Sequence, residues 1–172
     1  VDFRAGSACR WRFINIKKCK MIRNISYNDK KIKDEIIAMV GRPYTLFESV
    51  RMEGAGSPRF IIADCSDEIQ DILSLNTNFI NYCNIELRPE GVIVGFRSLL
   101  ETYAWVIPYF NLQVLANADH YEIQSNTNYM HIKNTHHSAV NKRFVNQLMR
   151  MKERYLLNSD NTCGKEHKCM TE

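Results

Sequence analysis

Two adjacent residues, Asp64 and Cys65, follow an apolar run and are the clearest candidates for nucleophilic chemistry in this sequence. A cysteine attacks as its thiolate and needs a base nearby, which a histidine distant in the sequence could supply. No sequence pattern marks an oxyanion hole or pairs a base with the thiol. Because Phe60–Ala63 has the composition of a strand, we interpret Cys65 as a buried strand residue and do not expect catalysis.

A second group of residues has the chemistry of metal ligands. Cys163, His167 and Cys169 lie within seven residues, and thiolate and imidazole are both ligands that zinc prefers. Chelation across so short a segment is strained, however, and a fourth ligand is missing. His131 and His137 also lack an acidic or thiol residue at a suitable spacing. We therefore expect no metal site and no bound cofactor.

The six cysteines indicate a reducing environment rather than a disulfide framework. Two of them lie in the first twenty residues and two in the last ten, which leaves Cys65 and Cys83 in the body of the chain. A chain of 172 residues can bury an adequate core without covalent links. We expect two free thiols in a cytoplasmic protein, and the alternative is a single bridge between them.

Positive charge is concentrated at the two ends of the chain. The formal charge is +4, but residues 1–20 carry six basic groups and one acidic group, whereas 21–140 carry 10 basic and 14 acidic groups. Attraction to nucleic acid or anionic lipid requires basic side chains gathered on one folded face. The body has no such pattern, so we expect no nucleic-acid partner and no contact with a membrane surface.

The longest apolar run, Tyr103–Phe110, is too short to cross a bilayer, which takes about 20 residues. Aromatic rings that stack on single-stranded bases are interleaved with basic residues, yet no Lys or Arg lies within 99–117. Packing in the core is therefore the expected role of these rings. Trp105 and Tyr109 remain candidates to line a peptide groove.

The N-terminal part of the chain predicts a helix followed by a hairpin. Apolar residues recur at three- and four-residue spacing over 28–40, and Gly41 follows as a stop signal. Two strands are expected next, Thr45–Met52 and Arg59–Ala63, joined by a glycine-containing loop. Residues 66–75 fit either a short helix or a further strand.

The second half of the chain predicts an antiparallel β-meander. Short runs rich in β-branched and aromatic residues alternate with turns that are too short for parallel crossovers. Such strands must pair in antiparallel fashion. The expected strands are 84–88, 92–96, 102–107, 112–115, 121–124 and 129–133.

An amphipathic helix over 139–157 follows the meander. Its apolar stripe must lie on one face or on the open end of the sheet. The basic residues of this helix offer a contact to acidic partners, although such residues usually form a solvated face. The stripe consists of Val140, Phe144, Leu148, Met151 and Tyr155, and the basic residues are Lys142, Arg143, Arg150, Lys152 and Arg154.

The composition, 45% hydrophobic and 24% charged, is typical of a globular domain. Because the chain begins with Val1 and Met21 opens a more regular pattern, we interpret the first residues as a leader or a segment added for expression. The expected divisions are 1–20, that leader; 21–78, an N-terminal helix and hairpin; 79–157, the meander with its C-terminal helix; and 158–172, a disordered tail.

A bent antiparallel meander followed by one C-terminal helix, with the segment VIPYFNLQV at 106–114, resembles the pleckstrin-homology-like superfold and its small bacterial members. The resemblance covers about 79–157 and implies an α+β fold with a partly open barrel capped by the helix. It places the ligand contacts of phosphoinositide-binding members near the loop between the first two strands, where Arg88 and Arg97 are the basic residues. Two arginines beside Glu90 make a poor phosphate clamp, so the resemblance favours protein or peptide binding.

These patterns together predict a non-enzymatic interaction module. The expected contact surfaces are the loop 53–58, the connection 97–101 and an unpaired strand edge that can accept an added strand. The alternative is a small enzyme or ligand carrier with a pocket between the meander and residues 44–75. That pocket would gather Asp64, Cys65, Glu101 and His120.

Overall fold

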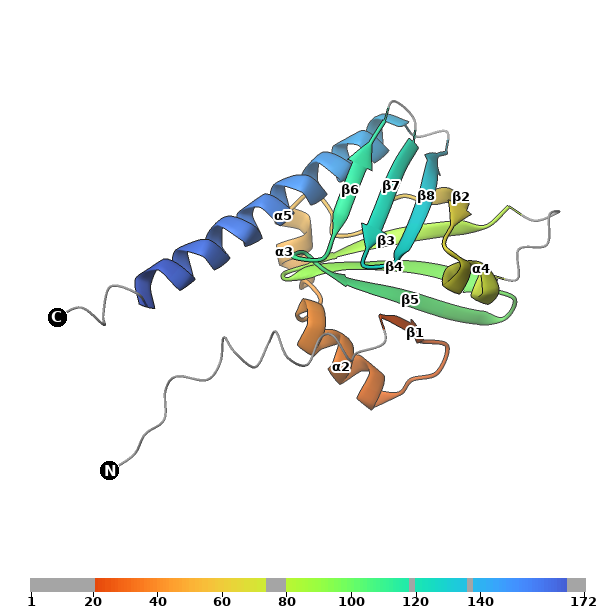
Figure 1. Cartoon of the computed structure of the whole chain (residues 1–172), viewed down its shortest axis with the longest axis horizontal. Coiled ribbons are helices and arrows are strands. Elements are labelled where there is room, and N and C mark those ends of the chain that lie inside the picture. The colour runs from red at the N-terminus through yellow and green to blue at the C-terminus, as the bar shows by residue number, and fades with distance from the viewer. Residues whose placement is uncertain (1–20, 74–79, 118–119, 136–137, 167–172) are drawn as a thin grey trace.

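The structure, a computed structural model, describes residues 21–73, 80–117, 120–135 and 138–166, with the side chains of the last helix over 139–159. Within these residues it is the expected α+β fold, built on one open sheet of eight antiparallel strands (Figure 1). The elements in chain order are β1 (Ile22–Asn24), α2 (Lys30–Val40), α3 (Leu46–Arg51), β2 (Phe60–Cys65), α4 (Asp67–Leu73), β3 (Tyr82–Arg88), β4 (Gly91–Ser98), β5 (Glu101–Pro108), β6 (Gln113–Ala116), β7 (His120–Ser125), β8 (Asn128–Asn134) and α5 (Ser138–Glu166).

The strand order is β1-β5-β4-β3-β2-β8-β7-β6, and each neighbouring pair is antiparallel. From β2 onward the chain forms one meander out to β5 and a second from β6 back to β8. The two meanders join where β8 pairs with β2. The edges of the sheet are β1 and β6.

The strand β2 allows the sheet to bend at this junction. Its register with β3 covers Phe60 and Ile61, and the Ile62 backbone amide donates to the Asn81 carbonyl oxygen just before β3. Its pairing with β8 extends along the whole strand, with a shift in register between Ile62 and Asp64. An extra residue on one strand of an antiparallel pair bends that strand and increases its twist. In Figure 1, β6, β7 and β8 accordingly run at a steep angle to β3, β4 and β5.

The main core fills the space between the inner faces of the two meanders. Its largest side chains include Trp105, Phe96 and Phe60, all almost fully buried. The Phe60 ring meets Tyr121 edge-on, with ring centroids 5.9 Å apart, which ties β2 to β7. Ile69 of α4 belongs to the same core. Burial of this apolar surface is the main source of stability.

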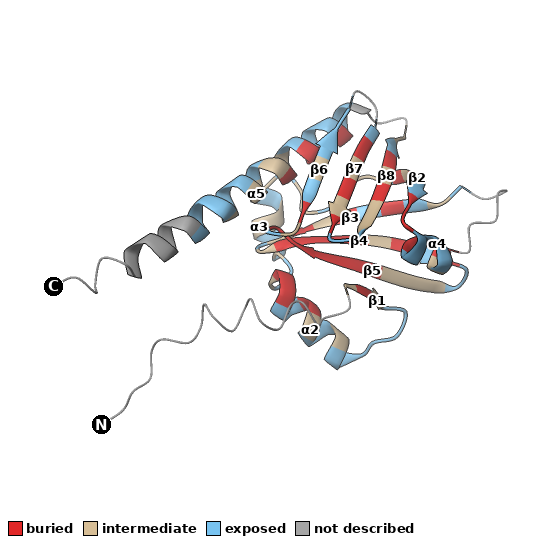
Figure 2. Cartoon of the chain, in the orientation of Figure 1, coloured by how far each residue is buried: buried red, intermediate tan, exposed pale blue. Residues whose placement is uncertain are grey.

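A second, smaller core lies between α2 and the opposite face of β4 and β5. Ile36, Met39 and Val40 of α2 pack there on Ile93, Ala104 and Val106. Since successive residues of a strand point to opposite faces, the consecutive buried residues at the start of β4 and at the end of β5 are covered on both sides, and Figure 2 shows these parts in red. At the start of β4, an added Cβ on Gly91 would lie 2.3 Å from the Ile107 carbonyl oxygen, so this position requires glycine.

The helix α5 packs on the main core through Phe144, Val145 and Leu148. Asn141 is also fully buried, and its side-chain amide donates a hydrogen bond to the Asn134 side-chain oxygen on β8, 3.0 Å away. The predicted stripe is therefore confirmed at Phe144 and Leu148. It is wrong at Val140, which is exposed because Asn141 occupies the buried position beside it.

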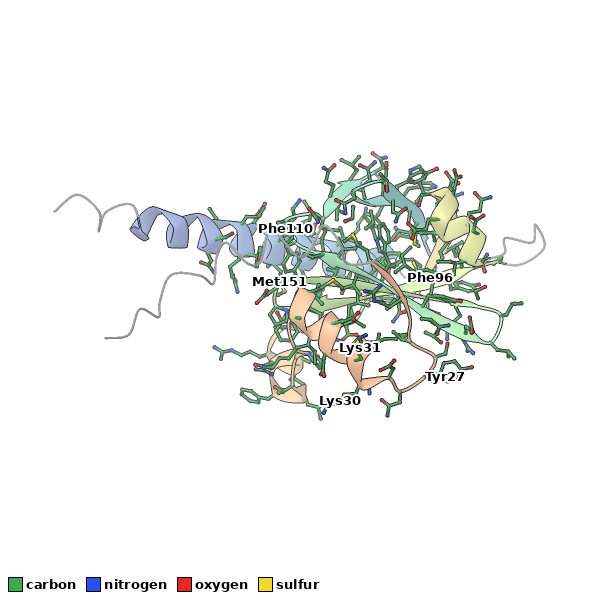
Figure 3. All side chains as sticks on the ribbon, turned by 60° about the horizontal axis from the view of Figure 1, so that its bottom comes forward. Tyr27, Lys30, Lys31, Phe96, Phe110 and Met151 are labelled. Carbon is green, nitrogen blue, oxygen red and sulfur yellow. The ribbon has the colours of Figure 1, made fainter. Side chains whose placement is uncertain are left out.

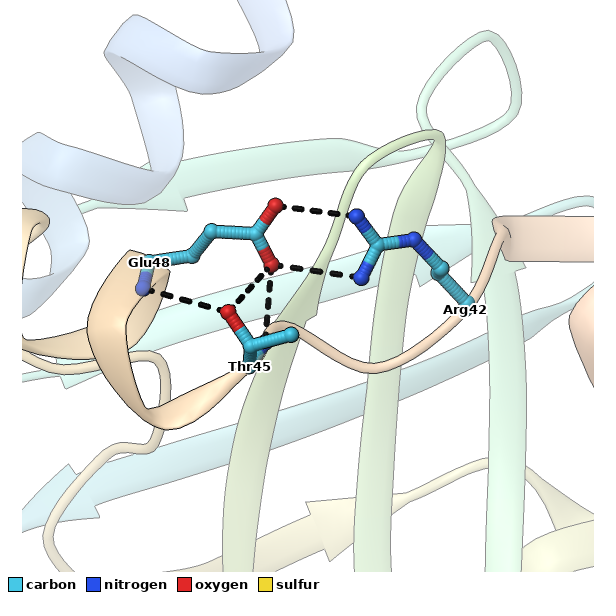
Figure 4. Close-up of polar contacts among 3 residues, drawn as sticks. All are labelled: Arg42, Thr45 and Glu48. Atoms are coloured by element: carbon cyan, nitrogen blue, oxygen red, sulfur yellow. Dashed lines mark hydrogen bonds and ion pairs between the residues drawn. The ribbon is translucent and has the colours of Figure 1, made fainter.

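The prediction of a strand at Thr45–Met52 is wrong, because residues 46–51 form the helix α3. The cause is a capping box (Figure 4). The Thr45 hydroxyl accepts a hydrogen bond from the Glu48 backbone amide, while the Glu48 carboxylate accepts one from the Thr45 backbone amide. Both helix-terminal amides are thus paired within the first turn, which stabilises a helix over a strand.

The other expected elements are present. All six strands of the meander are confirmed, residues 66–75 contain the helix α4, and Gly41 ends α2 with a φ of 84°. The short strand β1 was not expected. The helix α5 extends to Glu166, beyond the predicted end at 157, and the Ser159 hydroxyl donates back to the carbonyls of Tyr155 and Leu156. Residues 1–20 and 167–172 lie outside the described residues.

A matched pair of leucines on α5 tests whether this helix closes the core. Leu148 is 1% exposed and Leu157 is 64% exposed. We expect Leu148→Ala to lower the free energy of unfolding by about 3 kcal/mol, because it removes packed methyl groups and leaves a cavity. Leu157→Ala should change it by less than about 0.5 kcal/mol. Urea denaturation followed by circular dichroism measures both, and equal effects would contradict the proposed role of α5.

Candidate functional site: an arginine-lined groove

An open groove of about 900 Å³ lies between α5 and the segment that contains α3. The β3–β4 turn and the β5–β6 connection complete its wall through Pro89 and Phe110. Figure 3 places Phe110 close to Met151 of α5, another lining residue. We call this site the arginine groove. Its basic residues are Arg51, Arg143, Arg150 and Arg154, and its apolar and aromatic residues are Tyr44, Met52, Pro89, Phe110, Met151 and Tyr155.

Contacts between α5 and the loop after α3 hold the two walls together. The Gln147 side-chain amide donates to the carbonyl oxygens of Met52 and Gly54, at 2.6 and 3.1 Å. Beside it, the Arg143 guanidinium donates to the Glu53 carboxylate at 3.1 Å. Glu53 and Gly54 both have positive φ, 65° and 112°. This left-handed pair turns the loop so that its carbonyls face α5.

The helix α3 forms one wall and is held by polar contacts at its first turn. In addition to the capping box, Arg42 donates to both carboxylate oxygens of Glu48, at 2.9 and 3.3 Å (Figure 4). Hydrogen bonds from the Thr45 backbone and from Arg42 lower the pKa of Glu48 from 4.5 to about 2. The carboxylate is therefore ionised at neutral pH and fixes the start of α3.

Most of the positive charge in the groove is not neutralised. Arg143 pairs with Glu53, but among the described residues Arg51, Arg150 and Arg154 form no salt bridge. Arg150 and Arg154 are four residues apart on α5, a spacing at which like charges repel each other. The groove is thus a positive site in a body whose sequence is mildly acidic.

The floor of the groove continues the main core. Tyr44, Met52, Met151 and Tyr155 are partly buried and pack against it. The Tyr155 ring lies against Tyr109, with centroids 5.6 Å apart. Burial raises the pKa of Tyr44, and the charge of Glu48 raises it further, while Arg154 and Arg42 lower it. The groove therefore combines an apolar floor with a positively charged rim.

The solvent face of α3 adds an apolar surface beside the groove. Leu46, Phe47 and Val50 are 88%, 78% and 78% exposed, and α3 buries none of its residues. Phe47 is one helical turn before Arg51, which lines the groove, so the two side chains lie on the same face of α3. Single exposed apolar residues are common on protein surfaces, but three large ones within a six-residue helix form a patch of the kind that often marks an interaction site.

The predicted catalytic residues are not gathered in one pocket. Asp64 is exposed on β2, whereas Cys65 is buried on the opposite side of the strand. Glu101 begins β5 and His120 begins β7, and four strands separate β5 from β7 in the sheet. Glu101 accepts a hydrogen bond from Tyr103. Burial raises the pKa of Cys65 to about 11, and the Asp64 charge acts in the same direction.

A polar cluster that the sequence did not predict surrounds Asp64 on the outer face of β2, β7 and β8. The His131 imidazole lies 3.4 Å from Glu122 and 3.9 Å from Asp64. The Tyr129 hydroxyl donates to Asp64 at 3.3 Å. These contacts make a mutually paired surface network. We assign no chemistry to it.

The predicted ligand-binding residues do not form one site, although Arg88 and Tyr109 are in contact. Arg88 pairs with Glu86 at 2.9 Å at the β3–β4 turn, whereas Arg97 is exposed at the far end of β4. Trp105 and Tyr109 are fully buried. The Tyr109 hydroxyl donates to the Arg88 carbonyl oxygen at 3.0 Å, and its ring supports Tyr155 behind the groove.

The three predicted contact surfaces lie in different parts of the structure, and one of them belongs to the arginine groove. Glu53 of the 53–58 loop lines the arginine groove. In the 97–101 connection, Leu99 and Leu100 are almost fully exposed. The edge strand β6 borders a small cavity of about 210 Å³ that Lys142 and Asn146 of α5 also line.

No metal site is found in the part of the chain that the structure describes: no three side chains of His, Cys, Asp or Glu lie close enough together to hold an ion. The side chain of Cys163 and residues 167–172, with His167 and Cys169, lie outside that part. Cys65 and Cys83 are both free thiols, which confirms the expectation over the alternative bridge.

Sequence reasoning missed the groove because its basic residues come from distant segments. Arg143, Arg150 and Arg154 share one face of α5, and the sequence alone indicates a solvated surface there. Only the fold brings Arg51 and the apolar floor beside them. One signal was available in the sequence: Arg143, Arg150 and Arg154 are spaced by seven and four residues with Gln147 between them, which places all four side chains on one face of a helix.

No protein-family model, curated protein or solved structure matches this chain. Among the described residues, no helix combines the length and the apolar character that crossing a bilayer requires.

Thiol alkylation tests the conclusion that Cys65 is not a nucleophile. Burial raises the pKa of Cys65 to about 11 and that of Cys83 to about 12, from an ordinary value of 9.0. The thiols thus contribute stability below pH 9 that is lost as the pH rises further. At pH 8 we expect iodoacetamide to modify neither residue until guanidinium unfolds the protein, as peptide mass spectrometry would show. Rapid modification of Cys65 in the folded protein would restore the nucleophile hypothesis.

Acid titration tests how α3 is held. Because the pKa of Glu48 is lowered from 4.5 to about 2, its stabilising contacts are complete above pH 4.5 and lost as the pH falls toward 2. We expect the amide signals of 46–51 to move to disordered positions over this range, as NMR would detect. The Glu48→Ala variant, which removes the side chain that accepts from the Thr45 backbone amide and from Arg42, should have a frayed α3 already at neutral pH and show no such transition. A midpoint for Glu48 near its ordinary value would contradict this account.

Proposed function

We propose that this protein is a non-enzymatic interaction module that binds a segment of a partner protein in the arginine groove. One observation carries the proposal. An open groove combines an apolar floor with three arginines, Arg51, Arg150 and Arg154, that form no salt bridge among the described residues. Sites of this kind use the apolar floor for affinity and the charged rim for orientation.

We further propose that the fold belongs to the pleckstrin-homology-like lineage. The order of the meander from β2 to β8, with a C-terminal helix on the main core, supports this proposal. Arg88 and Arg97 do not favour phosphoinositide binding, because one is paired with Glu86 and the other lies at the far end of β4. Protein binding is the role in this lineage that the groove supports. The free thiols of Cys65 and Cys83 support a reducing compartment, which we propose to be the cytoplasm.

The alternative of a small enzyme or ligand carrier has less support. Its pocket required residues 44–75 together with Asp64, Cys65, Glu101 and His120. The groove does use residues 44–53, but none of those four side chains lines it. Its openness also leaves a small molecule largely exposed to water, whereas small-molecule sites usually bury most of their ligand.

Peptide display selects directly for the proposed activity. Random peptides would be selected on the immobilised full chain, with counter-selection against the double variant Arg150→Glu with Arg154→Glu. We expect enriched peptides that bind the double variant at least about tenfold more weakly, because two attractive charges become repulsive. The matched control is Arg59→Glu with Arg97→Glu, which changes the net charge equally at exposed positions outside the groove.

NMR mapping completes the test. A selected peptide should shift amide signals within 44–53 and 143–158 and leave the β4–β5 turn unchanged. If no peptide distinguishes the protein from the groove variant, or if the control double variant loses the same affinity, the proposal of a protein-binding groove is wrong.

A further inference from the structure

The charge of the groove limits the chemistry of its occupant. Three arginines without a salt bridge among the described residues line one open site, and two of them, Arg150 and Arg154, repel each other along α5. An occupant with negative charge would relieve this repulsion as it binds. The only acidic residue among those lining the groove, Glu53, is already paired with Arg143. This step rests on the proposed function, because it concerns the same groove.

The spacing of the arginines limits the conformation of the occupant. Arg143, Arg150 and Arg154 lie on one face of α5, and residues four apart on a helix are separated by about 6 Å along its axis. In an extended chain, residues two apart point to the same side and are separated by about 7 Å. Two acidic residues with one residue between them therefore match Arg150 and Arg154. The distance from Arg143 to Arg154, about 16 Å, corresponds to about five extended residues.

The apolar face of α3 adds a second requirement. Leu46, Phe47 and Val50 remain exposed although hydrogen bonds of the capping box and of Gln147 hold α3 and the loop that follows it. Phe47 and Arg51 share one face of α3, and Arg51 lines the groove, so this surface lies beside the groove. An occupant that carries a large apolar residue next to its acidic residues covers both surfaces at once.

We propose that the arginine groove binds an acidic protein segment in extended conformation, with carboxylates at alternate positions facing Arg150 and Arg154 and a large apolar residue beside them on Phe47. Charge complementarity identifies this occupant, and the exposed α3 face supplies its anchor.

A nucleic acid fits these observations less well. Bases stack on exposed aromatic rings between basic residues. Among the aromatic residues that line the groove, Tyr44 and Tyr155 are partly buried against the core and only Phe110, 38% exposed, offers an exposed ring. Elsewhere the exposed surface includes the acidic helix α4, with Asp67, Glu68 and Asp71, which would repel a long polyanion. The helix α4 lies at the opposite end of the sheet from α3 (Figure 1), so its acidic residues cannot enter the groove of the same molecule. They could enter the groove of a second copy of this chain, which is therefore the other acidic partner to be tested.

The experiment compares three short synthetic peptides by fluorescence anisotropy with the full chain. The parent peptide carries Glu at alternate positions followed by Phe and Leu, the second replaces each Glu by Gln, and the third replaces Phe and Leu by Ser. We expect the parent to bind at least about tenfold more tightly than either of the others. Its affinity should fall as salt is raised, because the charges are partly exposed to solvent.

Variants of the protein locate the contacts. The double variant Arg150→Glu with Arg154→Glu should bind the parent peptide at least about tenfold more weakly. Phe47→Ser should weaken binding at least about fivefold. Leu100→Ser is the matched control, because Leu100 is 90% exposed on the β4–β5 turn, and it should leave binding unchanged.

The outcomes separate this inference from the proposed function. If display-selected peptides bind the groove but neutral ones bind as tightly as acidic ones, the inference is wrong while the proposed function stands. If no peptide of any kind binds, both are wrong. Tighter binding of single-stranded RNA in competition with the parent peptide would overturn the inference in favour of a nucleic acid. Concentration-dependent dimerisation in sedimentation, lost in the Arg150→Glu and Arg154→Glu variant, would assign the groove to a second copy instead.

Discussion

The pairing of β2 with strands from both meanders is the constraint on which the rest of the structure depends. Phe60 pairs across the sheet with Cys83 on one side and Asn134 on the other, and its ring meets Tyr121. The register shift after Ile62 bends the strand at this junction. The two inner faces therefore enclose one core instead of forming a flat sheet with two exposed faces. The loop after α3 leads directly into β2, so the position of one groove wall follows from the same strand.

Coverage of the outer faces explains why the two meanders differ in sequence pattern. β4 and β5 are nearly continuously apolar because α2 covers the face turned away from the main core. β7 and β8 alternate between buried and partly exposed residues because among the described residues no helix covers their outer face. Polar residues such as His131 and Glu122 can pair there in contact with water. A charged residue placed in the middle of β4 would instead lose its hydration on either face.

These patterns decided how much could be predicted from the sequence. The strands from β3 to β8 are separated by short turns, all of which except the β4–β5 turn contain Gly, Pro or Asn, and α2 ends at Gly41, so local signals were sufficient. Residues 45–52 contain β-branched and aromatic residues that suggest a strand, but the hydrogen bonds between Thr45 and Glu48 outweigh that preference. The arginine groove could not be predicted, because Arg51 and the α5 arginines are about a hundred residues apart in sequence. Their proximity is a property of the closed core and not of any local pattern.

The arrangement of the groove has a consequence for how binding energy is used. An isolated helix as short as α3 would be unstable in water. Packing does not stabilise α3 either, because none of its residues is buried. Polar contacts hold it instead, from Thr45 and Arg42 at its start and from Gln147 at the loop that follows. A partner therefore meets a wall that is already ordered, and the entropy of forming α3 is not subtracted from the affinity. The same contacts keep Phe47 in water in the free protein, which is unfavourable for the isolated chain. Covering this side chain and neutralising the arginines beside it then contribute to binding in the same step.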